Sequence, residues 1–138
     1  MQRLFIDTGA WDAIADKGDK NHENALRFRD DIAGNYTLVT SNYVLDELYT
    51  LLLLNIGYPK TILFKQDLDI LREERVLDVI WVTGDIAKKA WKIFEQFNKD
   101  KRWSFTDCTS YVIMQDLCMT EVFAFDHHFE QMGFIRRP

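Results

Sequence analysis

Residues 3–9 read Arg-Leu-Phe-Ile-Asp-Thr-Gly, and this stretch decides how the rest of the chain is interpreted. A short apolar run followed at once by Asp, Thr and Gly is typical of a buried strand that ends in a turn, with the aspartate at its carboxyl end. Three later segments carry similar runs, at residues 37–40, 79–82 and 121–126, and the last again ends in an aspartate. The sequence therefore predicts four buried strands, two of which end in a carboxylate.

The segments between these runs have the apolar spacing of helices. We expect helices over residues 21–32, 42–57, 59–75 and 84–97, and one that Thr106 and Asp107 open and that continues to Cys118. Strands that read as continuous apolar runs and alternate with helices indicate a parallel sheet that is covered on both faces. The predicted fold is a three-layer α/β/α sandwich with a central parallel sheet, and residues 1–138 are expected to form one domain.

The composition is that of a soluble globular protein, with 47% hydrophobic residues, 28% charged residues and a formal net charge of −5. The two cysteines, Cys108 and Cys118, fall in one predicted helix, which argues against a disulfide framework and fits a reducing compartment. The longest apolar run, residues 51–54, is far below the ~18 residues of a membrane span, and aspartates come too early for a signal peptide. We therefore expect a cytoplasmic protein without a membrane segment.

The negative net charge bears on the class of ligand. It argues against a broad basic face for nucleic acid, because such binding depends on Lys and Arg that neutralise phosphates. Carboxylates that converge on divalent cations are an exception, since the filled site attracts phosphate. The position of the acids therefore matters more than their number.

Four carboxylates fall where a parallel α/β sheet has its ligand crevice, beyond the carboxyl ends of the strands. Asp7 and Asp126 end apolar runs, and Asp107 begins a helix. Glu47 lies about one and a half turns into the helix after the second strand, so its carboxylate can reach the same edge. The sequence predicts that these four acids converge.

Each acid also has a structural interpretation. An aspartate at a helix start is often a cap, and for Asp107 both interpretations stay open. Asp46 points about 100° away from Glu47, and Asp85 lies near a helix start, so neither is assigned to the site. Asp7 differs, because a buried carboxylate is costly without a partner and no Lys or Arg is adjacent to it. A cation is the expected partner of Asp7.

A cluster of carboxylates indicates a particular chemistry. Carboxylate oxygens favour hard cations such as Mg²⁺ or Mn²⁺, and two such ions can support phosphodiester hydrolysis without a protein nucleophile. The chain has no G-x-S-x-G, no Walker A sequence and no G-x-G-x-x-G, which removes the common serine-hydrolase, nucleotide-triphosphatase and dinucleotide-binding interpretations.

Four segments, in order along nearly the whole chain, carry a family resemblance. They are Phe5–Thr8, Asn42–Leu48, Ser104–Ser110 and Phe125–Phe129. Together they resemble a PIN domain, particularly the VapC-like toxin ribonucleases. One departure is Ala124-Phe125-Asp126, where many of these toxins have Thr-Asn-Asp, so whether Asp126 would touch a metal directly stays open.

The resemblance implies Mg²⁺- or Mn²⁺-dependent cleavage of RNA by a toxin that pairs with an antitoxin protein and often forms a homodimer. It also implies the site residues: the metal-binding acids Asp7, Glu47, Asp107 and Asp126, with an assisting hydroxyl from Thr8 or Thr106. The alternative is a catalytically silent PIN-like module that binds RNA or protein. A phospho-acceptor receiver is disfavoured, because the third predicted strand ends in Val82-Thr83 without an aspartate.

Other polar and aromatic residues have weaker assignments. Adjacent histidines point apart, so His127 and His128 are interpreted as a helix start in preference to a transition-metal site. Trp103 is interpreted as a core or interface residue, with stacking on an RNA base as the alternative. The cations best placed to contact an RNA backbone are Lys99, Lys101, Arg102, Arg136 and Arg137.

Overall fold

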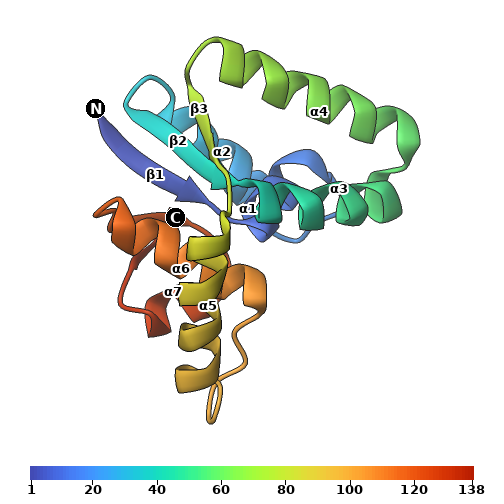
Figure 1. Ribbon diagram of the computed structural model, residues 1–138. Helices are drawn as coiled ribbons and strands as arrows, with labels where there is room; N and C mark the ends of the chain where they lie inside the picture. The colour runs from blue at the N-terminus through green and yellow to red at the C-terminus, as the bar shows by residue number, and fades with distance from the viewer.

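The computed structural model describes residues 1–138 and contains five strands and seven helices (Figure 1). In chain order the elements are β1 (Gln2–Ile6), α1 (Thr8–Ala15), α2 (His22–Ile32), β2 (Tyr36–Ser41), α3 (Asn42–Ile56), α4 (Tyr58–Glu73), β3 (Leu77–Ile80), α5 (Gly84–Phe97), α6 (Phe105–Asp116), β4 (Glu121–Phe123), α7 (His128–Gln131) and β5 (Ile135–Arg137).

The strands form one sheet in the order β3-β2-β1-β4-β5, and every neighbouring pair is parallel. Helices flank this sheet, with α3 and α4 on one side of the strands and α5, α6 and α7 gathered on another (Figure 1). The predicted three-layer α/β/α sandwich is therefore confirmed. Because β1 lies between β2 and β4, the chain changes direction across the sheet at β1, and such a switch point is where ligand crevices form.

The core is built around the central strand. Leu4, Phe5 and Ile6 of β1 are almost completely buried, as are Val122 and Phe123 of β4. These strands are apolar on both faces because helices cover both faces, which explains why they read as continuous apolar runs.

The third strand ends two residues earlier than the sequence predicts. β3 covers Leu77–Ile80, and Trp81, expected in the strand, is 69% exposed. The reason lies in its partner: Ser41 is the last residue of β2 and pairs with Ile80, so no ladder partner is left for Trp81. Beyond the strand, the Val82 amide donates instead to the Asn42 side chain.

Two short elements, α1 and β5, were absent from the sequence prediction, and α7 was predicted only as a helix start at His127 and His128. The turn expected at residues 7–9 is the start of α1, and the chain after β4 forms α7 and the edge strand β5. The helix α6 also ends at Asp116, so the prediction that it holds both cysteines is wrong. Cys108 is buried in α6, whereas Cys118 is exposed beyond it with a φ of 54°.

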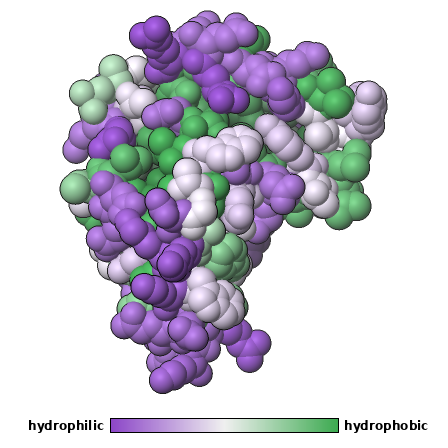
Figure 2. Space-filling view, viewed as in Figure 1, coloured by the Kyte–Doolittle hydropathy of each residue, from purple (hydrophilic) through white to green (hydrophobic).

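Apolar side chains are exposed where α3 meets α4. Leu54, Tyr58 and Leu63 are each more exposed than buried, and Figure 2 shows hydrophobic atoms at that edge of a surface that is hydrophilic over much of the remaining view. None of the helices combines the length and the apolarity that crossing a membrane would require.

Candidate active site

An open pocket of ≈ 400 Å³ lies at the carboxyl ends of β1 and β4, beside the start of α6. The four predicted acids all line it, so the structure brings together segments that are far apart in sequence. The lining residues are Asp7, Thr8, Gly9, Glu47, Leu51, Arg102, Ser104, Asp107, Asp126 and His128.

Asp7 follows the last residue of β1 and is held in place by its backbone. Its amide donates to the carbonyl of Phe123 at 3.1 Å, which continues the β1–β4 pairing by one residue. Asp7 is also the N-cap of α1, yet its carboxylate makes no capping hydrogen bond and only 7% of the residue is exposed. The carboxylate is thus buried without a side-chain partner.

The electrostatics of the pocket follow from that burial. The pKa of Asp7 is raised from 3.8 to about 8, mainly by burial, then by the negative charge of Asp107 and, to a smaller extent, by the charges of Glu47 and Asp126. A backbone hydrogen bond from Thr8 opposes these effects. A buried carboxyl that is surrounded by other carboxyls is destabilised in its charged form, and a bound cation would reverse that.

Glu47 reaches the pocket from α3 and is fixed there by Thr8. The buried Thr8 hydroxyl donates to Glu47 Oε1 at 2.8 Å, across 39 positions of sequence. This bond holds a surface glutamate against the end of β1. Thr8 therefore positions one acid while the residue before it supplies another.

Asp107 fulfils both interpretations that the sequence left open. It belongs to a capping box at the start of α6, in which the Asp107 amide donates to Ser104 Oγ at 2.9 Å and the Ser104 amide donates to Asp107 Oδ2 at 3.1 Å. It is also a buried carboxylate on the pocket wall. The cap fixes where this carboxylate points.

Asp126 and His128 also line the pocket. The His128 amide donates to Asp126 Oδ1 at 3.0 Å, and His128 Nδ1 lies 2.8 Å from Asp107 Oδ2 and 3.4 Å from Asp126 Oδ1. One ligand atom from each of these three residues lies within 4.8 Å of the others. His128 is thus a site residue that the sequence interpretation missed.

The two adjacent histidines have different environments. The side chain of His127 is 83% exposed and faces Glu130, while that of His128 is 27% exposed and faces the acids. The prediction that they lie at a helix start is correct, since α7 begins at His128. The signal that could have found His128 is its position two residues after Asp126. An Asp side chain commonly accepts a hydrogen bond from the amide two residues later, and this bond holds the two residues close together.

The second predicted hydroxyl lies elsewhere. Thr106 does not line the pocket, and its carbonyl accepts from the Thr109 hydroxyl at 2.7 Å. Ser104 lines the pocket on the α6 side instead. The excluded acids Asp46 and Asp85 are exposed and lie outside the pocket lining, as expected.

The cations predicted to contact RNA separate into two groups. Arg136 is paired with Glu130, Arg137 with Glu121 and Lys101 with Asp100. Neither Lys99 nor Arg102 forms an ion pair, and Arg102 lines the pocket. Arg102 is therefore the cation best placed to meet a bound phosphate.

Trp103 is a structural residue. It is 3% exposed, and its indole Nε1 donates to Gln131 Oε1 at 2.8 Å. This bond ties the loop before α6 to α7. The core interpretation of Trp103 is confirmed, and base stacking by this residue is excluded.

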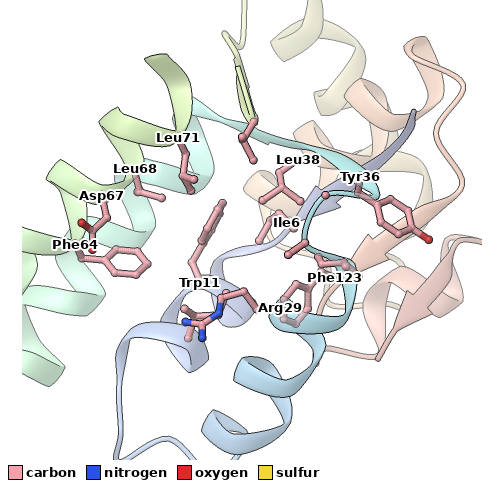
Figure 3. A pocket seen from close by; sticks show the side chains of 15 residues that line it. Ile6, Trp11, Arg29, Tyr36, Leu38, Phe64, Asp67, Leu68, Leu71 and Phe123 are labelled. Carbon is pink, nitrogen blue, oxygen red and sulfur yellow. The ribbon is translucent and has the colours of Figure 1, made fainter. Parts of the chain in front are cut away.

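A second pocket, of ≈ 390 Å³, is mostly apolar and was not predicted (Figure 3). Figure 3 shows Phe64, Leu68 and Leu71 of α4 on the side that faces Trp11 of α1. The only charged side chains that line it are Arg29 and Asp67, so it lacks the groups needed for phosphodiester chemistry. It shares α1 with the acidic pocket.

The chain thus combines an α/β/α sandwich, an all-parallel sheet and a cluster of acids at the switch point of that sheet. The family model of the PIN domain matches residues 4–135, so the chain belongs to the PIN domain family.

Within that family the chain is similar to the 23S rRNA-specific endonuclease VapC20 of Mycobacterium tuberculosis (strain ATCC 25618 / H37Rv). The two are 31% identical over 136 residues, which cover 98% of each chain. The crystal structure of VapC20 from Mycobacterium tuberculosis, a Sarcin-Ricin loop cleaving toxin, matches with a TM-score of 0.84 at 30% identity over 96% of each chain.

More distant structures share the fold alone. VapBC2 from Rickettsia felis, bound to a DNA fragment from their promoter, matches with a TM-score of 0.67 at 17% identity over 99% of this chain and 98% of that one. FitAcB from Neisseria gonorrhoeae matches with a TM-score of 0.70 at 15% identity over 98% of this chain and 96% of that one.

Proposed function

We propose that this protein is a metal-dependent endoribonuclease and the toxin of a toxin–antitoxin pair. The observation that carries the proposal is Asp7, a buried carboxylate without a side-chain partner that shares one pocket with three other acids. The similarity to VapC20 over nearly the whole chain supports RNA as the substrate, and structured ribosomal RNA in particular.

The residues present fit a divalent cation. The charged form of Asp7 is destabilised by burial and by neighbouring acids, and a cation supplies the missing positive charge. Every acid of the pocket offers oxygen ligands, which suit Mg²⁺ or Mn²⁺. We propose Asp7, Glu47, Asp107 and Asp126 as the residues that hold it. When bound, such a cation activates water and offsets the charge that develops on the phosphate.

The protein's own groups prepare this site. Thr8 holds Glu47 through a hydrogen bond, and the α6 capping box holds Asp107, so neither acid has to be ordered when substrate binds. Ordering side chains in advance lowers the free energy needed to reach the reactive arrangement. The Arg102 guanidinium at the pocket rim is suited to bind an RNA phosphate next to the cleaved bond.

The partner in this proposal is an antitoxin that places an Arg or Lys into the acidic pocket. The charge of the pocket favours a guanidinium, and the neighbouring apolar pocket offers contacts for an apolar segment of the same partner. An inhibitor that binds wholly away from both pockets would contradict this. Such a pair would act in the cytoplasm, where ribosomal RNA is found.

A homodimer belongs to the same proposal. The apolar side chains exposed where α3 meets α4 support a protein–protein contact on that edge, because exposed apolar patches commonly mark interaction surfaces.

The test is cleavage of 23S rRNA, and of a stem-loop RNA with the sarcin–ricin loop sequence, by the purified protein. We expect cleavage with Mg²⁺ or Mn²⁺, none in excess EDTA and none by Asp7→Asn. Undiminished cleavage in EDTA would exclude the metal mechanism. Metal and RNA binding without cleavage of any RNA tested would favour the catalytically silent module.

A further inference from the structure

We propose that His128 is a positioning residue that orients the carboxylates of Asp107 and Asp126 toward a divalent cation without binding the cation itself. The inference rests on the proposed function, because it concerns the same pocket. It adds a residue that the four-acid description leaves out.

The hydrogen bonds of His128 occupy one oxygen on each of two acids. Its ring Nδ1 lies 2.8 Å from Asp107 Oδ2, and its amide donates to Asp126 Oδ1 at 3.0 Å. Asp107 Oδ2 also accepts from the Ser104 amide at 3.1 Å. An ionised carboxylate only accepts hydrogen bonds, so Nδ1 must carry the proton in its bond to Asp107. The other oxygen of each acid has no protein donor and stays available to a cation.

His128 is itself held by the fold. The next residue, Phe129, is completely buried in the core. One turn further on, Gln131 accepts the hydrogen bond from the Trp103 indole. These contacts anchor α7 to the loop before α6, so the imidazole is fixed relative to both acids before any ligand binds.

This geometry argues against direct coordination by His128. Nδ1, the ring nitrogen that faces the acids, is already engaged with Asp107, and coordination through it would break that bond. The acids of the site offer oxygen ligands, which favour Mg²⁺ or Mn²⁺. Imidazole is instead typical of zinc, copper, iron and nickel sites. Hydrogen bonds to ligating carboxylates orient them, and loss of such a partner typically weakens metal affinity 10–100-fold.

The experiment measures Mn²⁺ affinity by calorimetry for the parent and four variants. We expect His128→Ala to bind Mn²⁺ roughly 10–100-fold more weakly than the parent. His128→Asn should recover most of the affinity, because the Asn amide nitrogen takes the position of Nδ1. His128→Gln, whose amide lies where Nε2 was, should behave like His128→Ala. His127→Ala, a change of the exposed neighbouring histidine, should match the parent.

A second measurement separates positioning from coordination. Electron spin echo spectra of the Mn²⁺-loaded parent should lack the nitrogen modulation of a bound imidazole. Nitrogen modulation that disappears in His128→Ala would overturn the proposal in favour of a histidine ligand.

Other outcomes also decide the matter. Equal affinity of His128→Ala and the parent would overturn the inference while leaving the proposed function intact. A parent that binds no Mn²⁺ would overturn both. Should His128→Ala fail to fold, the contrast between His128→Asn and His128→Gln decides, because equal affinity of those two would also overturn the inference.

Discussion

Replacing Asp7 by Asn should stabilise the metal-free protein, although it removes a proposed metal ligand. Asp7 is 93% buried, and its carboxylate has no side-chain partner. The amide oxygen of Asn can still accept the backbone hydrogen bond from Thr8, so the folded variant loses no hydrogen bond. The parent must either keep a charge there or take up a proton. The variant avoids both.

The magnitude follows from the pKa of Asp7. Folding raises that pKa from 3.8 to about 8. At pH 7, which is about three units above the pKa in the unfolded chain, the carboxyl is therefore ionised in the unfolded chain and mostly protonated in the folded one. At ~1.36 kcal/mol per unit, taking up that proton costs about 4 kcal/mol. Burial of the neutral Asn amide offsets part of this gain, so we expect Asp7→Asn to raise the free energy of unfolding at pH 7 by about 1–4 kcal/mol. For a chain of this size each kcal/mol raises Tm by roughly 3–4 °C.

The sign of the pH dependence follows from the same shift. Between pH 4 and pH 8 the folded parent binds a proton at Asp7 that the unfolded chain has released, so parent stability falls as pH rises through this window. Below pH 4 and above pH 8 this contribution no longer changes. The difference between Asp7→Asn and the parent should therefore grow from pH 4 to pH 8 and then level off.

The assay is urea unfolding of both proteins at pH 5, 7 and 8.5 in EDTA, repeated at pH 7 with Mn²⁺. Saturating Mn²⁺ at ~100 times its Kd should stabilise the parent by about 2.7 kcal/mol and the variant by much less. Asp46→Asn, an equal charge change on an exposed residue of α3, serves as the control. An Asp7→Asn protein that is less stable than the parent at pH 7 in EDTA would show that Asp7 is a structural partner and refute the reasoning.

Three further predictions test the parts of the site. Asp107→Ala should abolish cleavage and also lower stability by roughly 1 kcal/mol in urea unfolding, since it removes the side-chain oxygen that closes the α6 capping box; stabilisation comparable to that of Asp7→Asn would contradict this. Thr8→Val should lower kcat and weaken Mn²⁺ binding, because it frees the glutamate of α3, whereas Thr106→Val should change neither; equal effects of the two would remove the assigned role. Arg102→Ala should weaken RNA binding and make the slope of log K against log salt concentration shallower by a little less than one. Filter binding at several salt concentrations measures this slope. The control is Lys65→Ala on α4, away from the pocket.

The sequence by itself determined the central architecture and the acids. The runs that form β1 and β4 are apolar on both faces because helices cover both faces, so they can be read without knowledge of their neighbours. All strands of a parallel sheet point the same way, and the ends of these two therefore lie at one edge. Asp7 directly follows β1, whereas Asp126, which the sequence predicted at the end of its strand, lies three residues beyond the end of β4 at Phe123. Both acids still come after their strands, so their convergence could be predicted before any contact was known.

The tertiary structure decided everything that depends on a partner distant in sequence. β3 stops at Ile80 because β2 stops at Ser41, and no pattern within residues 77–82 contains that limit. The edge strand β5 is only three residues long and gains its order from pairing with β4. Short elements of this kind carry too few residues for a periodic signal.

The fine geometry of the site was decided in the same way. The bonds from Thr8 to Glu47 and from His128 to Asp107 span 39 and 21 positions, and each depends on the rotamers and the packing of two separate elements. A hydrogen bond tolerates only a few tenths of an ångström, whereas a sequence pattern places a residue no better than to a turn of helix or the end of a strand. The sequence could therefore name the acids, and only the folded chain could show which residues hold them.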